Sequence, residues 1–107
     1  MKRVMLTGGT GFLGSWVCAE LIERGWAVRI LDIQPKAANL DRVQRGLSGR
    51  VEMITGDIRD PQAVLSAATD CDAIVHLAGL MTVDCAADPV RGLEVNLLGS
   101  LNLIDAA

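Results

Sequence analysis

Early in the chain the sequence reads Thr7-Gly-Gly-Thr-Gly-Phe-Leu-Gly14. A short apolar run precedes it and stops at the glycines, which is typical of a strand buried on both faces, so we predict a strand over residues 2–7. After the turn, apolar residues recur at helical spacing, and Gly25 is a natural helix end. The amphipathic helix predicted there has on its apolar side Leu13, Trp16, Val17, Cys18, Leu21 and Ile22.

The turn between this strand and this helix carries the first functional signal. Gly9, Gly11 and Gly14 fit the pattern G-x-G-x-x-G, in which glycines allow a tight turn and a close backbone approach. The helix start adds unpaired N–H groups and a partial positive charge, so we expect it to bind an anion such as a pyrophosphate. A Walker A loop is disfavoured because Ser15 and Trp16 stand where that motif needs Lys and then Ser or Thr. The alternative is a turn that only packs the helix on the strand.

Strand and helix signals alternate along the rest of the chain. Further strands are predicted over residues 26–33, 51–55 and 72–77. Asp60-Pro61 and Asp88-Pro89 each place a cap residue before a first-turn proline, which predicts one helix through Ala68 and another to the end of the chain. Strands joined by helical crossovers form a parallel sheet. The predicted fold is therefore α/β, a partial Rossmann-type doubly wound parallel sheet with strand order 3-2-1-4.

The last helix and the end of the chain raise two expectations. One face of this helix carries the apolar residues Val90, Leu93, Leu97, Leu101 and Ile104. Because the helix is apolar on more than one side, we expect the sheet to cover one face and another helix or subunit to cover the other. The sequence stops at Ala107 without a fifth strand, whereas a complete domain of this type has about six strands. We therefore predict that residues 1–107 are the N-terminal part of a dinucleotide-binding domain, truncated before its fifth strand.

Asp32 predicts which dinucleotide binds. It ends the second strand, 18 residues after Gly14, where a carboxylate accepts hydrogen bonds from the ribose hydroxyls of adenosine. The same carboxylate would repel the 2′-phosphate of NADP, and no arginine stands beside it in the sequence. We therefore predict NAD as the cofactor and disfavour NADP. The alternative is a solvent-exposed acid at a strand end.

The composition excludes several classes of function. A net charge of -3 over 107 residues provides no basic surface for nucleic acid. No apolar run approaches the ~20 residues that cross a bilayer, so we predict neither a membrane span nor a signal peptide. Cys18, Cys71 and Cys85 lack paired C-x-x-C spacing and indicate buried, reduced thiols in a cytoplasmic protein. The single histidine, His76, cannot form a metal site alone, so we expect no metal.

Four motifs occur in the order seen in extended short-chain dehydrogenases/reductases. They are Thr7-Gly-Gly-Thr-Gly-Phe-Leu-Gly14, Gly56-Asp57-Ile-Arg-Asp60, His76-Leu-Ala-Gly79, and Asp88-Pro89 followed by Val95-Asn96-Leu-Leu-Gly99. Together they cover essentially all of the chain and resemble the NAD-dependent epimerase/dehydratase branch, which includes sugar-nucleotide 4-epimerases and dehydratases. The resemblance implies the NAD-binding portion of an enzyme that acts on a sugar nucleotide or sugar acid by hydride transfer. A non-catalytic dinucleotide sensor or scaffold of the same fold is the alternative.

The resemblance also implies a set of cofactor-binding residues. The pyrophosphate would meet Gly8, Gly11, Phe12, Leu13 and Gly14. The adenosine ribose would meet Asp32 and Ile33, and the adenine would meet Asp57 at its amino group and Ile58 at its ring. The nicotinamide side would lie along Leu77, Ala78 and Gly79, with His76 at the strand end near the cofactor. Asn96 resembles the family's helix asparagine, associated with the active-site hydrogen-bond network; purely structural bonding to the backbone is its alternative.

The catalytic residues of the family are absent from this sequence. The family's reaction uses a tyrosine with a lysine four residues on. The chain contains no tyrosine, and we expect its only lysines, Lys2 and Lys36, to lie far from any candidate site. We therefore assign no catalytic residue, with Asn96 as a candidate auxiliary, and predict that the Tyr-x-x-x-Lys pair and the substrate-binding part lie beyond Ala107. No turnover is expected from these residues alone.

Two further expectations concern the substrate and the assembly. Met81 stands where the sugar-nucleotide 4-epimerases usually carry a lysine, which argues against a UDP-hexose as the substrate. Family members commonly dimerise through a four-helix bundle, so we predict a homodimer that uses the helix over residues 89–107. Burial of this helix under a C-terminal part of the same protein is the alternative.

Overall fold

The computed structural model describes residues 1–107, except for the side chain of Thr82. Its strands are β1 (Arg3–Thr7), β2 (Ala27–Asp32), β3 (Glu52–Thr55) and β4 (Ala73–His76). Neighbouring strands are parallel and the order is β3-β2-β1-β4, which confirms the predicted α/β fold and strand order. Val4, Met5 and Leu6 of β1 are no more than 1% exposed, as a central strand covered on both faces requires.

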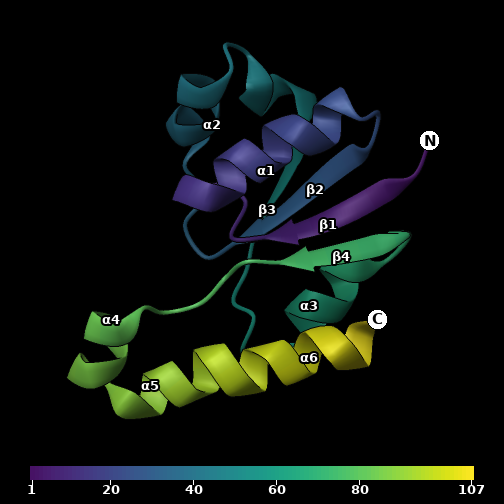
Figure 1. Cartoon of the computed structure of the whole chain (residues 1–107). Helices are drawn as coiled ribbons and strands as arrows, with labels where there is room; N and C mark the ends of the chain where they lie inside the picture. The colour runs from purple at the N-terminus through teal and green to yellow at the C-terminus, as the bar shows by residue number, and fades with distance from the viewer.

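Helices cover both faces of the sheet (Figure 1). On one face lie α1 (Phe12–Glu23), α2 (Ala37–Val43) and the short 3-10 helix η1 (Leu47–Arg50), and on the other lie α3 (Pro61–Ala68) and α6 (Gly99–Ala106). Successive strand residues point to opposite faces, so Val4 and Leu6 enter the core under α1 and α2 whereas Met5 enters the core under α3 and α6. The connection from β4 to α6 contains α4 (Thr82–Ala87), α5 (Pro89–Leu93) and the π-helical turn η2 (Glu94–Leu98). Figure 1 shows that α5 and α6 belong to one long helix.

The helix boundaries show where local sequence signals are sufficient. Asp60 caps α3 and Asp88 caps α5, each by accepting a hydrogen bond from a backbone N–H of the first turn, which confirms both predicted helix starts. Three short helices, α2, η1 and α4, were not predicted. α2 and η1 each bury a single side chain, Leu40 and Leu47 respectively, so neither has the periodic apolar face that a sequence pattern reveals.

The side of α1 that meets the sheet differs from the predicted side at two of the six predicted positions. Gly14 and Ser15 are buried, whereas Leu13 and Trp16 are 60% and 57% exposed. The first turn of α1 packs directly on the glycine turn, where only small residues have room, so the large side chains point outward. The prediction was therefore wrong for Leu13 and Trp16. The other predicted positions are buried or pack partly buried against the core: Val17, Cys18, Leu21 and Ile22.

The long C-terminal helix meets the rest of the protein through small residues. A Cβ atom on Gly92 would lie 2.8 Å from Sγ of Cys85, and one on Gly99 would lie 2.7 Å from Cδ1 of Ile58. Leu103 is buried on this side. The five residues that the sequence placed on one apolar face do lie on one side of the helix, but they are 49% to 71% exposed. We call them the outer apolar face: Val90, Leu93, Leu97, Leu101 and Ile104. This outer apolar face is opposite the side that covers the sheet.

The three cysteines lie in different environments. Cys18 is buried, and burial raises the pKa of its thiol to about 11. Cys71 and Cys85 are only partly buried, and all three thiols are free. The prediction of buried thiols is thus confirmed for Cys18 and wrong for the other two. Within the described part of the chain, no helix combines the length and the apolar character needed to span a membrane.

Candidate cofactor site

A pocket lies beyond the carboxyl ends of all four strands. From β1 the chain continues to β2 on one side of β1 and returns later to β4 on its other side, so the strand order switches direction at β1. In open parallel sheets this switch in strand order is where ligands bind. Nine of the thirteen predicted site residues line the pocket: Gly8, Gly11, Asp32, Ile33, Asp57, Ile58, Leu77, Ala78 and Gly79. Four do not: Phe12, Leu13, Gly14 and Asn96. Five lining residues were not predicted: Leu31, Gly56, Leu80, Arg91 and Val95.

The glycine turn forms the floor of this pocket, and its glycines have different roles. Gly8 has a φ of 68°, and a Cβ atom there would lie 2.9 Å from the backbone N of Ala78. A Cβ atom on Gly14 would collide with the carbonyl oxygen of Gly8, so this glycine lets α1 begin against the turn. Gly9 packs on Ile30 in the core and does not line the pocket. Within this turn the glycine with the positive φ is Gly8, which precedes the G-x-G-x-x-G pattern that begins at Gly9.

The start of α1 offers free hydrogen-bond donors to the turn. Gly11 is the N-cap residue and has no side chain, so no side-chain cap satisfies the first N–H groups of the helix. The side chains of Phe12 and Leu13 are 90% and 60% exposed and point away from the pocket lining, so these residues offer backbone N–H groups only. Uncapped N–H groups and the positive end of the helix dipole attract an anion. A phosphate group suits this position.

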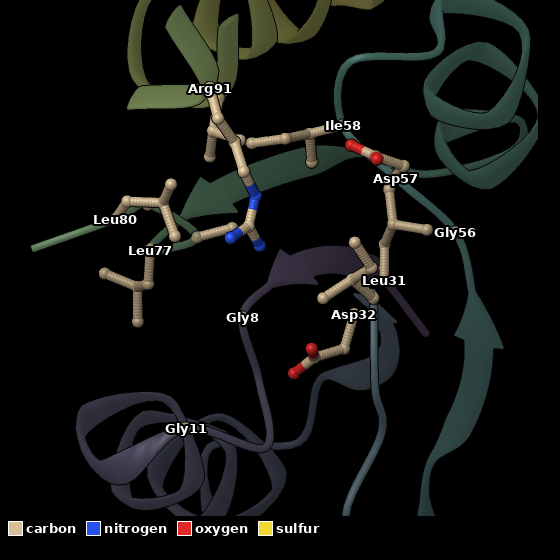
Figure 2. A pocket seen from close by; sticks show the side chains of 14 residues that line it. Gly8, Gly11, Leu31, Asp32, Gly56, Asp57, Ile58, Leu77, Leu80 and Arg91 are labelled. Atoms are coloured by element: carbon tan, nitrogen blue, oxygen red, sulfur yellow. The ribbon is translucent and has the colours of Figure 1, made fainter. Parts of the chain in front are cut away.

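Asp32 is held in a defined orientation at the end of β2. Its Oδ2 accepts a hydrogen bond from the Thr10 hydroxyl at 2.7 Å, and its Oδ1 accepts one from the backbone N–H of Gln34 at 3.2 Å. Thr10 is itself fixed, because Asn39 donates to its carbonyl at 2.8 Å. Figure 2 shows the carboxylate directed toward the glycine turn. Since a carboxylate has about four lone-pair positions, it retains acceptor capacity for a ribose hydroxyl.

A basic residue that was predicted to be remote lies close to Asp32. Lys36 lines a shallow groove together with Asp32, Ile33 and Gln34 at the edge of the pocket. The prediction that Lys36 lies far from any candidate site was therefore wrong. Lys36 follows Asp32 by only four residues, so its closeness to this carboxylate could have been inferred from the sequence.

Asp57 and Ile58 occupy the loop after β3. The guanidinium of Arg59 donates to Oδ2 of Asp57 at 2.7 Å and, with Arg91 acting in the same direction, holds the pKa of that carboxyl below its usual range. Asp57 is therefore a carboxylate at neutral pH. Ile58 is 6% exposed and packs against Gly99 of α6, so it forms a rigid wall of the pocket.

His76 belongs to a hydrogen-bond chain behind the pocket. The hydroxyl oxygen of Thr7 accepts from the N–H groups of Leu77 and Ala78, so its own hydrogen is donated to Nδ1 of His76 at 2.6 Å. Nε2 then carries the ring hydrogen and donates to the hydroxyl of Ser100 at 3.1 Å. Burial lowers the pKa of His76, which favours this neutral form. Both ring nitrogens are thus engaged, and His76 does not line the pocket that the sequence placed it near.

Asn96 holds the segment after β4 in place. Its Oδ1 accepts from the backbone N–H of Leu80 at 2.7 Å, and its Nδ2 donates to the carbonyl of Leu80 at 2.9 Å. A Cβ atom on Gly79 would lie 3.2 Å from Oδ1 of Asn96, so a glycine suits that position. This arrangement agrees with the backbone-bonding alternative for Asn96, which shapes one side of the pocket through Leu80.

Together these features define a Rossmann-type dinucleotide-binding protein: a parallel sheet, a glycine turn before an uncapped helix, and a carboxylate at the end of the second strand. The model of the NAD dependent epimerase/dehydratase family matches residues 4–107. The chain belongs to that family.

Similar proteins include several UDP-glucose 4-epimerases and a D-erythronate dehydrogenase. The chain is 37% identical to UDP-glucose 4-epimerase 3 of Oryza sativa subsp. japonica over 96% of its own length and 30% of that protein. It is 34% identical to a UDP-glucose 4-epimerase of Klebsiella pneumoniae over 97% of its length and 78% of that protein. It is 42% identical to the D-erythronate dehydrogenase of Cupriavidus necator over 96% of its length and 33% of that enzyme.

Solved structures agree with this assignment. UDP-glucose 4-epimerase of Thermus thermophilus in complex with NAD superposes with a TM-score of 0.79 at 38% identity and covers 97% of this chain. The enzyme of Stenotrophomonas maltophila with bound NAD gives a TM-score of 0.85 at 30% identity and covers 99% of this chain. The present chain spans 33% of the length of each of these two proteins.

Proposed function

We propose that this chain is the NAD-binding portion of an enzyme that acts on a sugar nucleotide or a sugar acid by hydride transfer. The observation that carries the proposal is the fixed carboxylate of Asp32, which faces the glycine turn at the edge of the pocket. The cofactor, when bound, supplies the hydride acceptor at C4 of its nicotinamide. The named relatives include both an epimerase of a sugar nucleotide and a dehydrogenase of a sugar acid, so both substrate classes belong to the proposal.

Different pocket residues would bind different parts of the cofactor. The uncapped N–H groups after Gly11 would hold the pyrophosphate, and Asp32 would accept hydrogen bonds from the adenosine ribose. Ile33 and Ile58 would cover the adenine from two sides, next to the carboxylate of Asp57. The small residues after β4 would let the nicotinamide end approach the backbone. None of these residues performs the proton transfer of the reaction.

The preference for NAD over NADP tests the role of Asp32. NAD should bind more tightly than NADP, because a 2′-phosphate would meet this carboxylate. Asp32→Ala should weaken NAD binding about tenfold or more and narrow the preference, as the loss of hydrogen bonds to a charged group implies. Isothermal titration calorimetry with both dinucleotides measures the effect.

Two further variants distinguish the effect of the Asp32 carboxylate on NAD affinity from the effects of its neighbours. Thr10→Val has nearly the same shape and keeps the carboxylate but removes its 2.7 Å hydrogen bond, so it should weaken NAD binding less than Asp32→Ala does. Lys36→Gln removes the cation in the neighbouring groove and should lower NADP affinity more than NAD affinity. Equal affinity of the unmodified chain for NAD and NADP would contradict the proposal.

The proposal also concerns turnover. The chain contains no tyrosine, so we infer that its 107 residues bind the cofactor without catalysing the reaction. NAD-dependent oxidation of any sugar or sugar acid by the purified chain would show this inference to be wrong. An activity screen of the complete gene product with NAD, against UDP-glucose and a panel of sugar acids, distinguishes the two substrate classes.

We further propose that the protein forms a homodimer through the outer apolar face. Its five residues are large, apolar and exposed, and they follow one side of a helix that runs from α5 to α6. An exposed apolar stripe of this length is typical of a helix that packs against another helix. Sedimentation velocity at micromolar concentration should show a dimer that Leu97→Asp converts to a monomer. A monomeric unmodified protein at that concentration would refute the dimer.

A further inference from the structure

Two arginines lie near the pocket, and only one of them has partners. Arg59 donates to Asp57 at 2.7 Å and lies 3.8 Å from the carboxylate of Glu94. Arg91, on α5, lines the pocket. Within the part of the chain that the structure describes, its guanidinium forms neither an ion pair nor a hydrogen bond with another side chain. Arg59 is thus committed to the protein, whereas Arg91 is available to a ligand.

The side chain of Arg91 extends into the pocket. Figure 2 shows its guanidinium in the middle of the pocket, between Leu77 and Leu31, and directed toward the glycine turn at Gly8. The backbone that carries it is fixed, because Asp88 accepts a hydrogen bond from its N–H at 3.1 Å and Gly92 packs closely against Cys85. The guanidinium and the start of α1 therefore face each other across the pocket.

The charges of the pocket explain why a cation is needed there. Among the residues that line it, Asp32 and Asp57 are the carboxylates and Arg91 is the cation. A dinucleotide brings a negative charge on each of its two phosphates into the same space. The helix dipole of α1 offers only a partial positive charge at one side. A second positive group opposite the glycine turn would offset the repulsion between the pyrophosphate and the carboxylates.

We propose that Arg91 binds the pyrophosphate of the dinucleotide from the side opposite the glycine turn. A guanidinium is a planar donor that matches two phosphate oxygens at once, and a bound cofactor would exclude water from this contact. This inference rests on the proposed binding of NAD and names a residue that positions it. Through Arg91, α5 forms the side of the cofactor site opposite the glycine turn.

Arg91→Gln tests the contact. The variant should bind NAD and ADP-ribose about tenfold more weakly, because it loses a charge-assisted contact to an exposed side chain, and should bind adenosine as the unmodified chain does. Arg91→Lys keeps the charge but not the planar donor pair, so its loss should be smaller. Arg45→Gln removes the same charge from an exposed position outside the pocket and should change none of the affinities. Calorimetry measures the dinucleotides and ligand-observed NMR measures adenosine.

The outcomes separate this inference from the proposed function. A shallower dependence of NAD affinity on salt in Arg91→Gln, with adenosine unchanged, supports the pyrophosphate contact. Unchanged NAD affinity in this variant overturns it, as does an equal loss for adenosine, which would place the guanidinium on the adenine, or a loss confined to NADP. If the unmodified chain binds ADP-ribose in an Arg91-dependent manner but does not bind NAD, the contact stands and the proposed cofactor is wrong. Circular dichroism confirms that each variant folds.

Discussion

The two faces of the sheet are covered to different degrees. On one face α1, α2 and η1 enclose a cluster in which the side chains of Leu6, Ile30, Leu40 and Leu47 are fully buried. On the other face α3 and α6 cover a second cluster, but the long C-terminal helix turns its larger apolar residues outward and buries Leu103. The first face has the larger set of fully buried side chains, although Leu13 and Trp16 of α1 remain exposed on its outer side. The second presents the outer apolar face and the unpaired Arg91, to which we have assigned the proposed dimer and the proposed phosphate contact.

The largest effect is expected where α1 meets the pocket. In Gly14→Ala the new methyl group would collide with the carbonyl oxygen of Gly8, so α1 could not begin against the turn. We expect a loss of about 3 kcal/mol in the free energy of unfolding, together with loss of NAD binding. Urea unfolding and calorimetry measure the two effects.

Gly49→Ala is the matched control for this substitution. A Cβ atom at Gly49 meets nothing within 4 Å, so this variant should change the free energy of unfolding by less than about 0.5 kcal/mol. If the two variants were equally stable, the close approach of α1 to the turn would not matter for this protein.

A second pair of substitutions compares the two sides of α6. Leu103→Ala removes a side chain that is 4% exposed, and we expect a loss of about 2.5 kcal/mol in the free energy of unfolding. Leu101 lies one half-turn away and is 49% exposed, so Leu101→Ala should cost less than about 1 kcal/mol when the protein is dilute. Urea unfolding over a range of protein concentrations measures both. A cost at Leu101 that grows with concentration would show that a second copy buries the outer apolar face.

The smallest effect is a dependence on pH at the contact between the sheet and α6. Because burial lowers the pKa of His76 in the folded chain, the unfolded chain takes up a proton first, at its ordinary pKa of about 6.5, as the pH falls. The contribution of His76 is complete above that pH. It decreases as the pH falls through about 6.5 toward the lower pKa of the folded form. Thermal unfolding between about pH 7.5 and pH 5.5 measures the change.

His76→Gln is the control for the pH dependence. Glutamine has one acceptor and one donor group, so it offers partners to Thr7 and Ser100 without titrating. The variant should lose most of the pH dependence in this range. An unchanged pH dependence would assign the effect to other groups and leave His76 without an energetic role between β4 and α6.

Sequence patterns predicted those parts of the fold whose causes are local. The buried strands, the Asp-Pro helix starts and the strand order all follow from runs of a few residues and from the right-handed connection of parallel strands. Nine of the site residues predicted from the motifs also line one pocket in the structure. It did not single out Arg91, because an arginine in the first turn of a helix carries no sequence signal of the direction in which it points.

By itself, therefore, the sequence determined the parallel sheet, the glycine turn and the carboxylate at the end of β2, because each depends on neighbouring residues and on the period of a strand or helix. Only the tertiary structure decided that Leu13 and Trp16 of α1 and the large apolar residues of the C-terminal helix point outward. Small residues such as Gly14 and Gly99 allow close packing and send their larger neighbours outward. It also decided the surroundings of the pocket, where Arg91 approaches from a distant part of the chain while His76 turns away from the pocket into its own hydrogen bonds. These placements depend on packing between distant segments, which no local pattern records.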